Sequence, residues 1–565
     1  MNNDKAIKPE MPKLKIGFIV DSPLASKYCY ELVRRCAGDS RFDVNCLILQ
    51  NIPISKGVFL RVLELIKNRR VADLISTFTF YIVITLERML LSGMKQYSDH
   101  FFKFDLSALF PHRVEIAPEV SDHAGVYNYS KQDVEKVRSL KIDVLVSFGS
   151  LILGGEILGA ARRGILLGPH GDSSSDNSGP AGFWEVYFEE DTSEFNIQCL
   201  AEKLNSERVI FRGSIGTKYS YLLNQAALYA SQSSHLFLLL ASLCSHGKFP
   251  ARNVIFPSYK NSYRYPTFIQ SLNYGLKLGT RLISKFSARL FGYQYRWNVA
   301  FSRTAWTNLV MSAATVIKNP NGRFLADPFL VSKNGKDYCF VEDYIEAIKK
   351  GVISVYQIDD NNATRLGEVL SEPFHLSFPF VFEYNDQLYM CPETGEADDI
   401  RLYKCLEFPM KWGLSHVLMA DVSAVDTIIF QQHGVWWMFT NISPFKDGDY
   451  CSALFIFSAD HPLSDSWTPH VGNPVIIDAN GGRNAGFLID GNIVYRPGQC
   501  QGFDLYGKYF GLNQIKSLTL NSYEEKRVCN VLPKFFKGIS GTHHIHSAGN
   551  LTVFDFVRKT RRSKR

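Results

Sequence analysis

The C-terminal half of the sequence repeats one pattern at intervals of about 50 residues, a period typical of propellers and solenoids. Each copy has small or polar residues, an apolar run, a two-residue turn such as Asn-Gly or Asp-Gly, and a second apolar run, which together predict a β-hairpin. The copies begin at Ala326, Ser377, Ala424, Gly482 and Ile539. One hairpin would be weak evidence, but five copies at one period predict a five-bladed β-propeller over residues 301–556.

One residue near the start of each copy is expected to face the central channel of the propeller. These lead residues are Asp327, Phe378, Asp426, Ala485 and Thr542. The second strands of copies one, two and four end on charged residues, which should reach the same region: Glu342, Glu393 and Arg496.

The charged residues of the repeat predict a carbohydrate site, because sugars offer hydroxyl groups to carboxylates and apolar faces to aromatic rings. The aromatic residues expected beside the charges are Trp436, Trp437, Tyr495 and Tyr506. Glycosidic bond chemistry needs one protonated and one ionised carboxyl group. The predicted catalytic residues are Asp327, Glu393 and Asp426, and the predicted substrate-binding residues are Glu342, Arg483, Arg496 and His543. For any one carboxylate the alternative of capping a blade turn stays open.

The N-terminal part reads as an α/β domain over residues 13–246. Apolar runs at 14–20 and 42–50 flank a segment of helical spacing, and further apolar runs follow at 142–148 and 164–167. This order predicts a parallel sheet, with a mostly helical insertion at 57–110. The loop after Leu167 is expected at the carboxyl end of a buried strand, where ligands of such sheets bind. The fold class is therefore multidomain, an α/β domain followed by an all-β propeller.

Residues 247–300 are predicted to connect the two domains through an amphipathic helix at 267–291. Apolar residues recur there at helical spacing, and four basic residues follow one another at intervals of four: Lys277, Arg281, Lys285 and Arg289. An interdomain helix with its charges in water or facing acidic surface is the favoured interpretation. Peripheral membrane contact through 267–291 or the basic tail 557–565 is the alternative.

Length and charge limit the remaining interpretations. A chain of 565 residues exceeds one ordinary core, so two or more domains are expected. The net charge of +7 is uneven, since residues 208–326 hold fifteen lysines and arginines and no acid. Packing within the chain explains this better than nucleic-acid binding, because no nucleic-acid motif accompanies the charge. The run Leu74–Leu86 is too short to span a bilayer and predicts a buried or interface helix.

The eleven cysteines are scattered, without a CxxC pair or metal-ligand spacing. They predict reduced thiols and no metal site, and with the absence of a signal-like N-terminus they predict a cytoplasmic protein, peripheral at the inner membrane face if the membrane alternative holds.

Residues 13–230 resemble the catalytic domain of the formyltransferase family, most clearly over 144–213. The segments that carry the resemblance are RGILLGPHGD at 163–172, GPAGFWEVYFEE at 179–190 and KLNSERVI at 203–210. The resemblance implies 10-formyltetrahydrofolate as cofactor and an active site of Asn, a His two residues later, and an Asp. Here the corresponding positions hold Gly168, His170 and Asn205. Two of the three side-chain roles are therefore altered, and Asp172 is a candidate substitute.

The residues that this resemblance places at the site are His170, Asp172 and Asn205 as catalytic, and Gly168, Phe183, Trp184 and Glu185 as substrate-binding.

The propeller segments HLSFPFVF, YMCPET, AVDTIIF, WWMFT and YRPGQ resemble the N-terminal domain of glucosamine inositolphosphorylceramide transferases, and ADPF with VDTIIF resembles arabinanase- and xylosidase-type glycoside hydrolases. The blade-four Glu that those hydrolases use as acid is not found; Arg496 or Gln499 stands nearby. The resemblance implies a sugar-binding propeller and a glycan context.

These features predict a transferase of surface-glycan biosynthesis that acts on an amino- or nucleotide-sugar, with a degenerate formyltransferase-like domain. Two alternatives stay open: a true sugar N-formyltransferase that uses 10-formyltetrahydrofolate, and a non-catalytic carbohydrate-binding scaffold. The expected partner in each case is a carbohydrate or nucleotide-sugar, and no nucleic acid.

Overall fold

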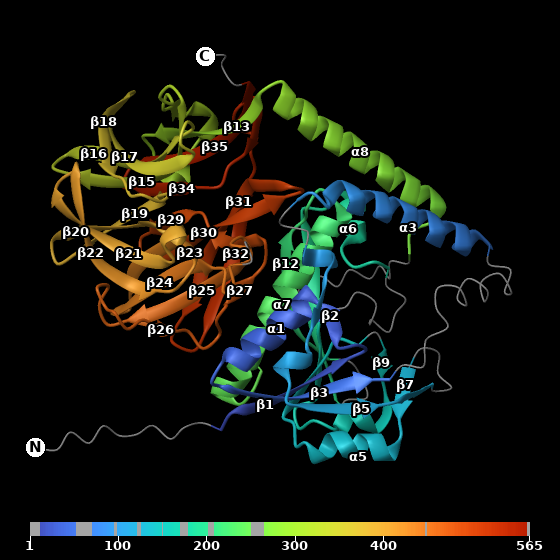
Figure 1. The fold of residues 1–565 in the computed structure, drawn as a ribbon. Helices are drawn as coiled ribbons and strands as arrows, with labels where there is room; N and C mark the ends of the chain where they lie inside the picture. The colour runs from blue at the N-terminus through green and yellow to red at the C-terminus, as the bar shows by residue number, and fades with distance from the viewer. Residues whose placement is uncertain are drawn as a thin grey trace, which may run out of the picture. The chain divides into compact units, whose positions relative to one another are not determined.

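The computed structural model describes residues 12–51, 71–94, 99–120, 126–149, 151–169, 179–201, 208–249, 265–446 and 449–561. The chain forms two compact units (Figure 1). Unit 1 consists of residues 1–188, 194–212 and 220–278, and unit 2 of residues 189–193, 213–219 and 279–565.

Unit 1 is built on a seven-stranded sheet in the order β12-β11-β10-β8-β1-β3-β5. Five strands run parallel: β1 (Leu14–Val20), β3 (Phe42–Gln50), β5 (His112–Ile116), β8 (Val144–Ser147) and β10 (Ile165–Leu167). β11 (Thr192–Leu200) joins β10 antiparallel, and β12 (Arg208–Gly216) lies at the edge. Residues such as Ile48 and Leu145 are fully buried, as continuous apolar runs of a doubly covered sheet require.

Capped helices pack onto this sheet. α1 (Lys27–Gly38) begins after Ser26, whose hydroxyl accepts from Cys29 N, and α5 (Lys131–Ser139) begins after Ser130 in the same way. α7 (Tyr221–His246) ends at Gly247, which has the left-handed conformation of a helix C-terminus. α7 contacts α1 through a hydrogen bond from Ser233 Oγ to the carbonyl of Tyr28, 3.0 Å long. This long, largely buried helix closes unit 1.

The region predicted as a helical insertion is only partly helical where it is described. α3 spans Val71–Leu91, whereas β4 (Lys103–Asp105) pairs with β2 (Leu24–Ser26), and η1 (Asp99–Phe101) and η2 (Ser107–Leu109) are short 3-10 turns. Three short strands form a separate small sheet: β6 (Pro118–Val120), β7 (Val126–Tyr129) and β9 (Ile152–Leu153). The 3-10 turn η3 (Gly155–Gly159) follows β8, and α6 (Phe183–Phe188) precedes β11.

Two described helices are long and apolar enough to cross a membrane, residues 72–91 in α3 and 221–246 in α7. α7 is mostly buried, as a core helix would be, but only 22% of the apolar window of α3 is buried. The apolar segment that contains Leu74–Leu86 is therefore longer than predicted, so the prediction that it is too short to span a bilayer is wrong. Of the predicted buried or interface helix, the buried alternative is also wrong, because only one face of α3 packs inward while Phe78, Leu86 and other apolar residues are exposed.

Unit 2 contains five blades of mainly four strands. Blade one holds β15 (Arg323–Lys333), β16 (Lys336–Ile345), β17 (Lys350–Ile358) and β18 (Ala363–Leu370). Blade two holds β19 (Ser377–Tyr384), β20 (Gln387–Glu393), β21 (Asp399–Glu407) and β22 (Lys411–Ala420). Blade three holds β23 (Ala424–Gln432), β24 (Val435–Ile442), β25 (Ala453–Ala459) and β26 (Thr468–Pro469), with β27 (Ile476–Ile477) paired to β25.

Blades four and five share one sheet because β29 pairs with β34. Blade four holds β29 (Gly486–Asp490), β30 (Ile493–Gly502), β31 (Leu505–Leu518) and β32 (Tyr523–Val531), and β28 (Asn480–Asn484) also pairs with β30. Blade five holds β34 (Ile545–Ala548), β35 (Leu551–Arg561), β13 (Tyr293–Ser302) and β14 (Thr315–Val316), with β33 (Ile539–Gly541) paired to β35.

The ring is closed by strands from its two ends. β13 precedes blade one in the chain, yet it pairs antiparallel with β35 from Tyr293 opposite Arg561 to Ser302 opposite Thr552. β13 thus begins before residue 301, the predicted start of the propeller. Phe301 is almost fully buried and packs with residues of blade one, so the closing strand also carries part of the core.

Three lead residues share one unusual backbone conformation. Asp327, Phe378 and Asp426 have φ values of 48°, 45° and 50°, and each lies within a β-bulge of the first hairpin of its blade. Left-handed conformations are unfavourable for residues other than glycine and are found mainly where the surrounding structure enforces them, often at functional sites. A bulge also changes the direction of a side chain. The bulge therefore changes the direction of the lead side chain in blades one, two and three.

Phe301→Ala should lower the free energy of unfolding by about 3–5 kcal/mol, because it leaves a cavity in the core beside the closing strand. Urea denaturation followed by tryptophan fluorescence measures the change. Leu366→Ala, at an exposed position of β18, is the control and should change the free energy little. An equal loss in both variants would contradict a special role for the closing strand.

Candidate functional site

The predicted carboxylates gather at one end of the propeller channel because of strand register. Ala326, next to Asp327, pairs with Glu342, and Ser377 pairs with Glu393. Since the first strand of each blade runs from its lead residue toward the hairpin turn, lead residues and second-strand ends share one end of the channel. Asp327, Glu342, Glu393, Asp426 and Asp555 are all largely buried there and are called the carboxylate cluster below.

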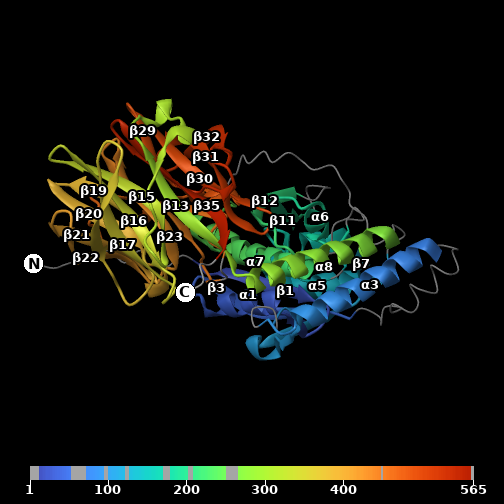
Figure 2. The same ribbon diagram turned by 90° about the horizontal axis from the view of Figure 1, so that it is seen from above.

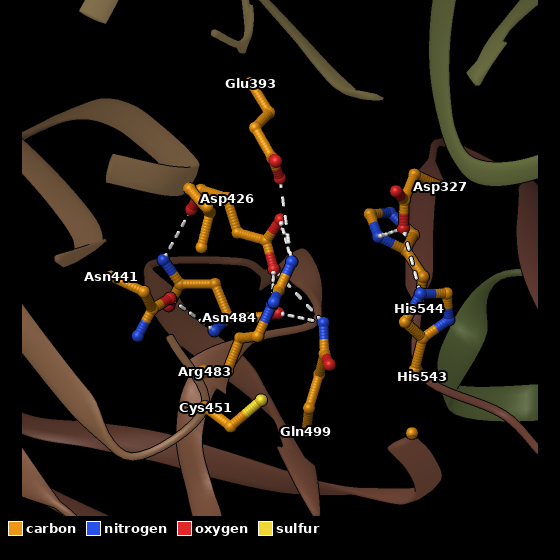
Figure 3. Close-up of polar contacts among 12 residues, drawn as sticks. Asp327, Glu393, Asp426, Asn441, Cys451, Arg483, Asn484, Gln499, His543 and His544 are labelled. Carbon is orange, nitrogen blue, oxygen red and sulfur yellow. Dashed lines mark hydrogen bonds and ion pairs between the residues drawn. The ribbon is translucent and has the colours of Figure 1, made fainter. Parts of the chain in front are cut away.

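Arg483 holds Asp426 at the centre of the carboxylate cluster (Figure 3). Its Nε lies 2.6 Å from Asp426 Oδ2, and its Nη2 lies 3.2 Å from Oδ1, which is the two-pronged geometry of a strong arginine–carboxylate pair. Gln499 Nε2 donates to Asp426 Oδ2 at 3.1 Å. Asn484 Nδ2 donates to the carbonyl of Asp426 at 2.8 Å and so fixes its backbone. Asp426 is therefore an oriented, ion-paired carboxylate.

Glu393 faces the same guanidinium from blade two. Its Oε2 lies 3.6 Å from Arg483 Nη2, too far for a close hydrogen bond. Burial, followed by the negative charge of Asp426, raises the pKa of Glu393 to about 8. Near neutral pH this carboxyl group is mostly protonated, while Asp426 across the guanidinium is ion-paired.

Asp327 lies beside a pair of histidines on the other side of the cluster (Figure 3). His543 Nε2 and His544 Nδ1 each lie 3.5 Å from Asp327 Oδ1. Burial raises the pKa of Asp327 to about 7, although the charge of His543 lowers it. A group with this pKa can both accept and release a proton near neutral pH.

His543 bridges two carboxylates. Its Nδ1 lies 2.6 Å from Asp555 Oδ2, and the other oxygen of Asp555 accepts from the backbone N–H groups of His543 and His544, both at 3.0 Å. Burial lowers the pKa of His543, but the charges of Asp555 and Asp327 outweigh it and raise the pKa above its ordinary value. Asp555 was not predicted from the sequence, because it lies in the middle of an apolar strand.

The same three residues, Asp327, His543 and Asp555, offer ligand atoms that all lie within 4.8 Å of one another. Two carboxylates and an imidazole could bind a divalent cation. The short contact of His543 with Asp555 fits a protonated imidazole between two carboxylates equally well. The sequence had suggested no metal site, since these ligands are far apart in the chain.

Glu342 is a buried carboxyl group next to His375. Burial, followed by the charge of Asp327, raises the pKa of Glu342 well above its ordinary value. His375 Nε2 lies 3.5 Å from Glu342 Oε1, while His375 Nδ1 accepts from Gly351 N at 2.9 Å. An Nδ1 that accepts requires the proton on Nε2, so this ring can donate toward Glu342.

Two aromatic rings lie beside the charges. Trp297 from β13 packs against His543 with ring centroids 3.9 Å apart, and the Tyr506 ring lies 5.2 Å from the Arg483 guanidinium carbon. Tyr506 is 40% exposed, so an open aromatic face adjoins the buried cluster. Gln499 Oε1 is a buried acceptor for which the described residues provide no hydrogen-bond partner. Aromatic rings beside side chains that can hydrogen-bond to hydroxyl groups are typical of sugar sites.

A cavity of about 680 Å³ lies at the hairpin ends of the first strands. Aromatic residues such as Phe382 and Trp436 line it, together with His546. Between this cavity and the cluster, Phe329 packs on Phe378 and His544, with centroids 4.9 and 4.6 Å apart. Phe329 also packs on His546 of the cavity lining, with ring centroids 5.0 Å apart, so aromatic rings lie between the cluster and the cavity.

Several predicted residues lie away from the cluster. Arg496 is buried but pairs with Glu525 at 2.6 Å and donates to the carbonyl of Gly481 at 2.7 Å. Trp436 lines the far cavity, and Tyr495 packs against Trp306 at 4.9 Å. Trp437 is buried in β24. Of the four predicted aromatic residues, only Tyr506 adjoins the carboxylates, whereas Trp297 was missed because it precedes the repeat.

In unit 1, His170, Asp172 and Asn205 lie outside the described residues. A side chain at Gly168 would meet the Phe148 ring, whose atoms lie 2.7–2.9 Å from an ideal Cβ, so the asparagine of the formyltransferase pattern would require that ring to shift. Phe183 and Trp184 are buried, and Phe183 packs against Tyr274 and Phe80, while the neighbouring Glu185 is half-buried. Phe183 and Trp184 are core residues rather than open contacts, and the formyltransferase resemblance stays a prediction.

Comparison with known proteins concerns the propeller. Residues 285–548 match the sequence model of the family described as "Glucosamine inositolphosphorylceramide transferase 1, N-terminal". The glucosamine inositolphosphorylceramide transferase 1 of Oryza sativa subsp. japonica is 34% identical over 285 residues, 46% of this chain and 38% of that protein. The Arabidopsis thaliana protein of that name is 36% identical over 237 residues, 40% of this chain and 30% of that protein. The chain thus spans less than two fifths of either relative.

Solved structures with a similar fold include glycoside hydrolases. A family 117 glycoside hydrolase of Zobellia galactanivorans gives a TM-score of 0.32 at 11% identity and covers 47% of this chain and 91% of that one. The GH62 α-L-arabinofuranosidase catalytic domain of Coprinopsis cinerea gives 0.33 at 12% identity and covers 47% and 97%. Likeness at this level does not bear on function.

The raised pKa values predict how stability depends on pH. In the unfolded chain the pKa of Asp and Glu is about 4. In the folded protein the pKa of Glu393 is about 8, so Glu393 keeps its proton to that pH. The folded state therefore binds more protons in this window, and the free energy of unfolding contributed by Glu393 falls as pH rises. Glu393→Gln should become more stable relative to the natural protein as pH rises from 5 to about 8.

Thermal melts across this pH range measure the difference. Glu383→Gln, at an exposed position of β19, is the control and should track the natural protein at every pH. A constant difference between Glu393→Gln and the natural protein would show that Glu393 titrates normally.

Proposed function

We propose that this chain is a transferase of glycan or glycolipid synthesis, and that the carboxylate cluster is where a sugar binds and reacts. The observation that carries the proposal is the arrangement of two acids on one guanidinium, with Asp426 ion-paired and Glu393 mostly protonated. Acid–base chemistry at a glycosidic bond needs one carboxyl group in each state. The relatives' names support a transferase, but their matched part is described as N-terminal and is less than two fifths of each protein, so activity is not carried over with the match.

Each residue has a role that its surroundings favour. Glu393 can donate its proton to the leaving oxygen as the bond from that oxygen to the anomeric carbon breaks. Asp426, fixed by Arg483, places negative charge where positive charge develops on the sugar ring. Asp327 can take the proton of the acceptor hydroxyl as that oxygen bonds to the anomeric carbon. His543, held by Asp555, stabilises the ionised form of Asp327 that accepts this proton. Trp297 and Tyr506 offer apolar faces to the sugar.

A non-catalytic carbohydrate-binding role is the second candidate. One reason is that Arg483 already contacts both Asp426 and Glu393. The other is that the resembled hydrolases have their acid in blade four, where this chain has Arg496 or Gln499 instead. In that case the cluster would bind a sugar by hydrogen bonds and Tyr506 would stack on it.

Asp327→Asn and Glu393→Gln should each reduce sugar transfer by at least about a hundredfold, the usual effect of losing a general acid or base. The assay uses nucleotide-sugar donors and amino-sugar or inositol-phospholipid acceptors, with product detected by mass spectrometry. Asp337→Asn, which alters a partly exposed carboxylate paired with Arg303, is the control and should retain activity.

Binding measured by saturation-transfer NMR separates the two candidates. Sugar binding that is weakened by Asp426→Asn, without turnover on any donor, would favour the binding role and contradict catalysis. Normal turnover by both Asp327→Asn and Glu393→Gln would remove the cluster as the reaction site.

The formyl-transfer alternative makes a separate prediction. If unit 1 transfers a formyl group from 10-formyltetrahydrofolate to an amino sugar, His170→Ala should abolish that turnover, because His170 is the one residue of the family's trio retained in this sequence. Glu393→Gln is the control and should have no effect. Absence of formyl transfer by the natural protein would remove this alternative.

A cytoplasmic location stays a prediction from cysteine usage.

A further inference from the structure

Helix α8 (Phe268–Leu290) exposes an apolar stripe along its whole length. Exposed residues recur at intervals of three, four and seven, which places them on one face of a helix: Ile269, Leu272, Leu276, Ile283, Phe286 and Leu290. Ile283, Phe286 and Leu290 are 68%, 69% and 68% exposed. A helix on a water-facing surface normally turns polar residues outward, so this face is built to be covered.

The basic residues of α8 lie away from this stripe. Lys277 Nζ donates to the carbonyl of Tyr187 at 2.8 Å, Arg281 Nη2 pairs with Glu189 at 2.8 Å, and Lys285 pairs with Asp504 at 2.5 Å. These contacts follow the favoured interpretation of charges facing acidic surface. They also show that the stripe and the basic row are different faces of one helix.

α3 lies alongside the first part of α8 within unit 1 (Figures 1 and 2). Ser76 Oγ accepts from Phe268 N at 3.0 Å, and Tyr274 Oη donates to Glu87 Oε2 at 2.8 Å. The outer face of α3 is also apolar and exposed, at Ile75, Phe78, Ile82, Leu86 and Met89. Two adjacent helices therefore present apolar residues where polar residues would suit water.

An aromatic and basic strand face follows directly after α8 in unit 2. Tyr293 and Tyr295 of β13 are exposed, and their cross-strand partners on β35 are Arg561 and Lys559. Directly paired residues share one face of a sheet. Lys559 Nζ lies 5.5 Å from the centre of the Tyr293 ring. The basic end of β35 is thus held beside the last turn of α8, where Arg289 is also exposed.

We propose that the exposed stripe at the end of α8, Ile283, Phe286 and Leu290, together with the strand face of Tyr293, Tyr295, Lys559 and Arg561 that follows it in unit 2, binds the surface of an anionic bilayer. Apolar residues of a helix lying in the interface insert below the headgroups, tyrosines favour the headgroup level, and cations bind anionic lipids. A second copy that meets the same face fits less well, because α8 and β13 contain no acid to meet Arg289 and the basic end of β35.

The experiment is vesicle flotation with the full chain. Vesicles are phosphatidylcholine alone or with about one third phosphatidylserine, at low and high salt. We expect binding to the anionic vesicles that weakens with salt. Ile283→Asp with Phe286→Asp, and separately Lys559→Glu with Arg561→Glu, should each reduce binding at least about tenfold.

Matched controls lie on other blades. Leu414→Asp with Val417→Asp changes exposed apolar residues of β22, and Lys333→Glu with Lys336→Glu changes exposed lysines of blade one; both should bind vesicles normally. Circular dichroism and melting temperature establish that each variant folds.

Three outcomes would overturn the proposal. These are no binding to either vesicle, equal binding by the natural protein and the Ile283→Asp/Phe286→Asp variant, and a dimer in lipid-free buffer that this variant dissociates. The proposal does not depend on sugar transfer. Transfer to a soluble amino-sugar acceptor is assayed without vesicles, so loss of transfer and loss of vesicle binding are separate results.

Discussion

The antiparallel pairing of β13 with β35 is the contact on which the rest of unit 2 depends. It closes the ring of blades and buries Phe301, and it also brings Trp297 of β13 against His543, which holds Asp555 and faces Asp327. At its other end the same pairing sets Tyr293 and Tyr295 beside Arg561 and Lys559. One ladder of backbone hydrogen bonds therefore positions part of the carboxylate cluster and part of the proposed membrane surface.

Burial determines the chemistry of the cluster more than any single partner does. Five carboxylates lie together with one arginine that contacts two of them and one histidine between two others. Taking charges out of water is costly, so some groups keep their protons, as Glu393 does, while Asp426 is stabilised by Arg483. Three left-handed lead positions add backbone strain that the surrounding strands must hold. The cost in stability fits a site retained for binding or reaction.

Prediction from the sequence succeeded where a signal is local or periodic. Hairpin repeats predicted the five blades, and equivalent positions in the copies predicted that Asp327, Glu393 and Asp426 lie near one another at the channel. Helical spacing predicted α8 at nearly its observed bounds. For α3 the sequence predicted a buried or interface helix without deciding between them, because apolar content does not tell which face a neighbouring helix will cover.

The sequence by itself determined the order of elements, the blade period and the residue types that face the channel, since these depend on near neighbours in the chain. Only the tertiary structure decided that Asp555 and Trp297 join the site, that Arg496 pairs with Glu525 instead, and that basic β35 lies beside α8. Each of these contacts joins segments through ring closure or packing between blades, and no local pattern encodes which distant side chain will meet another.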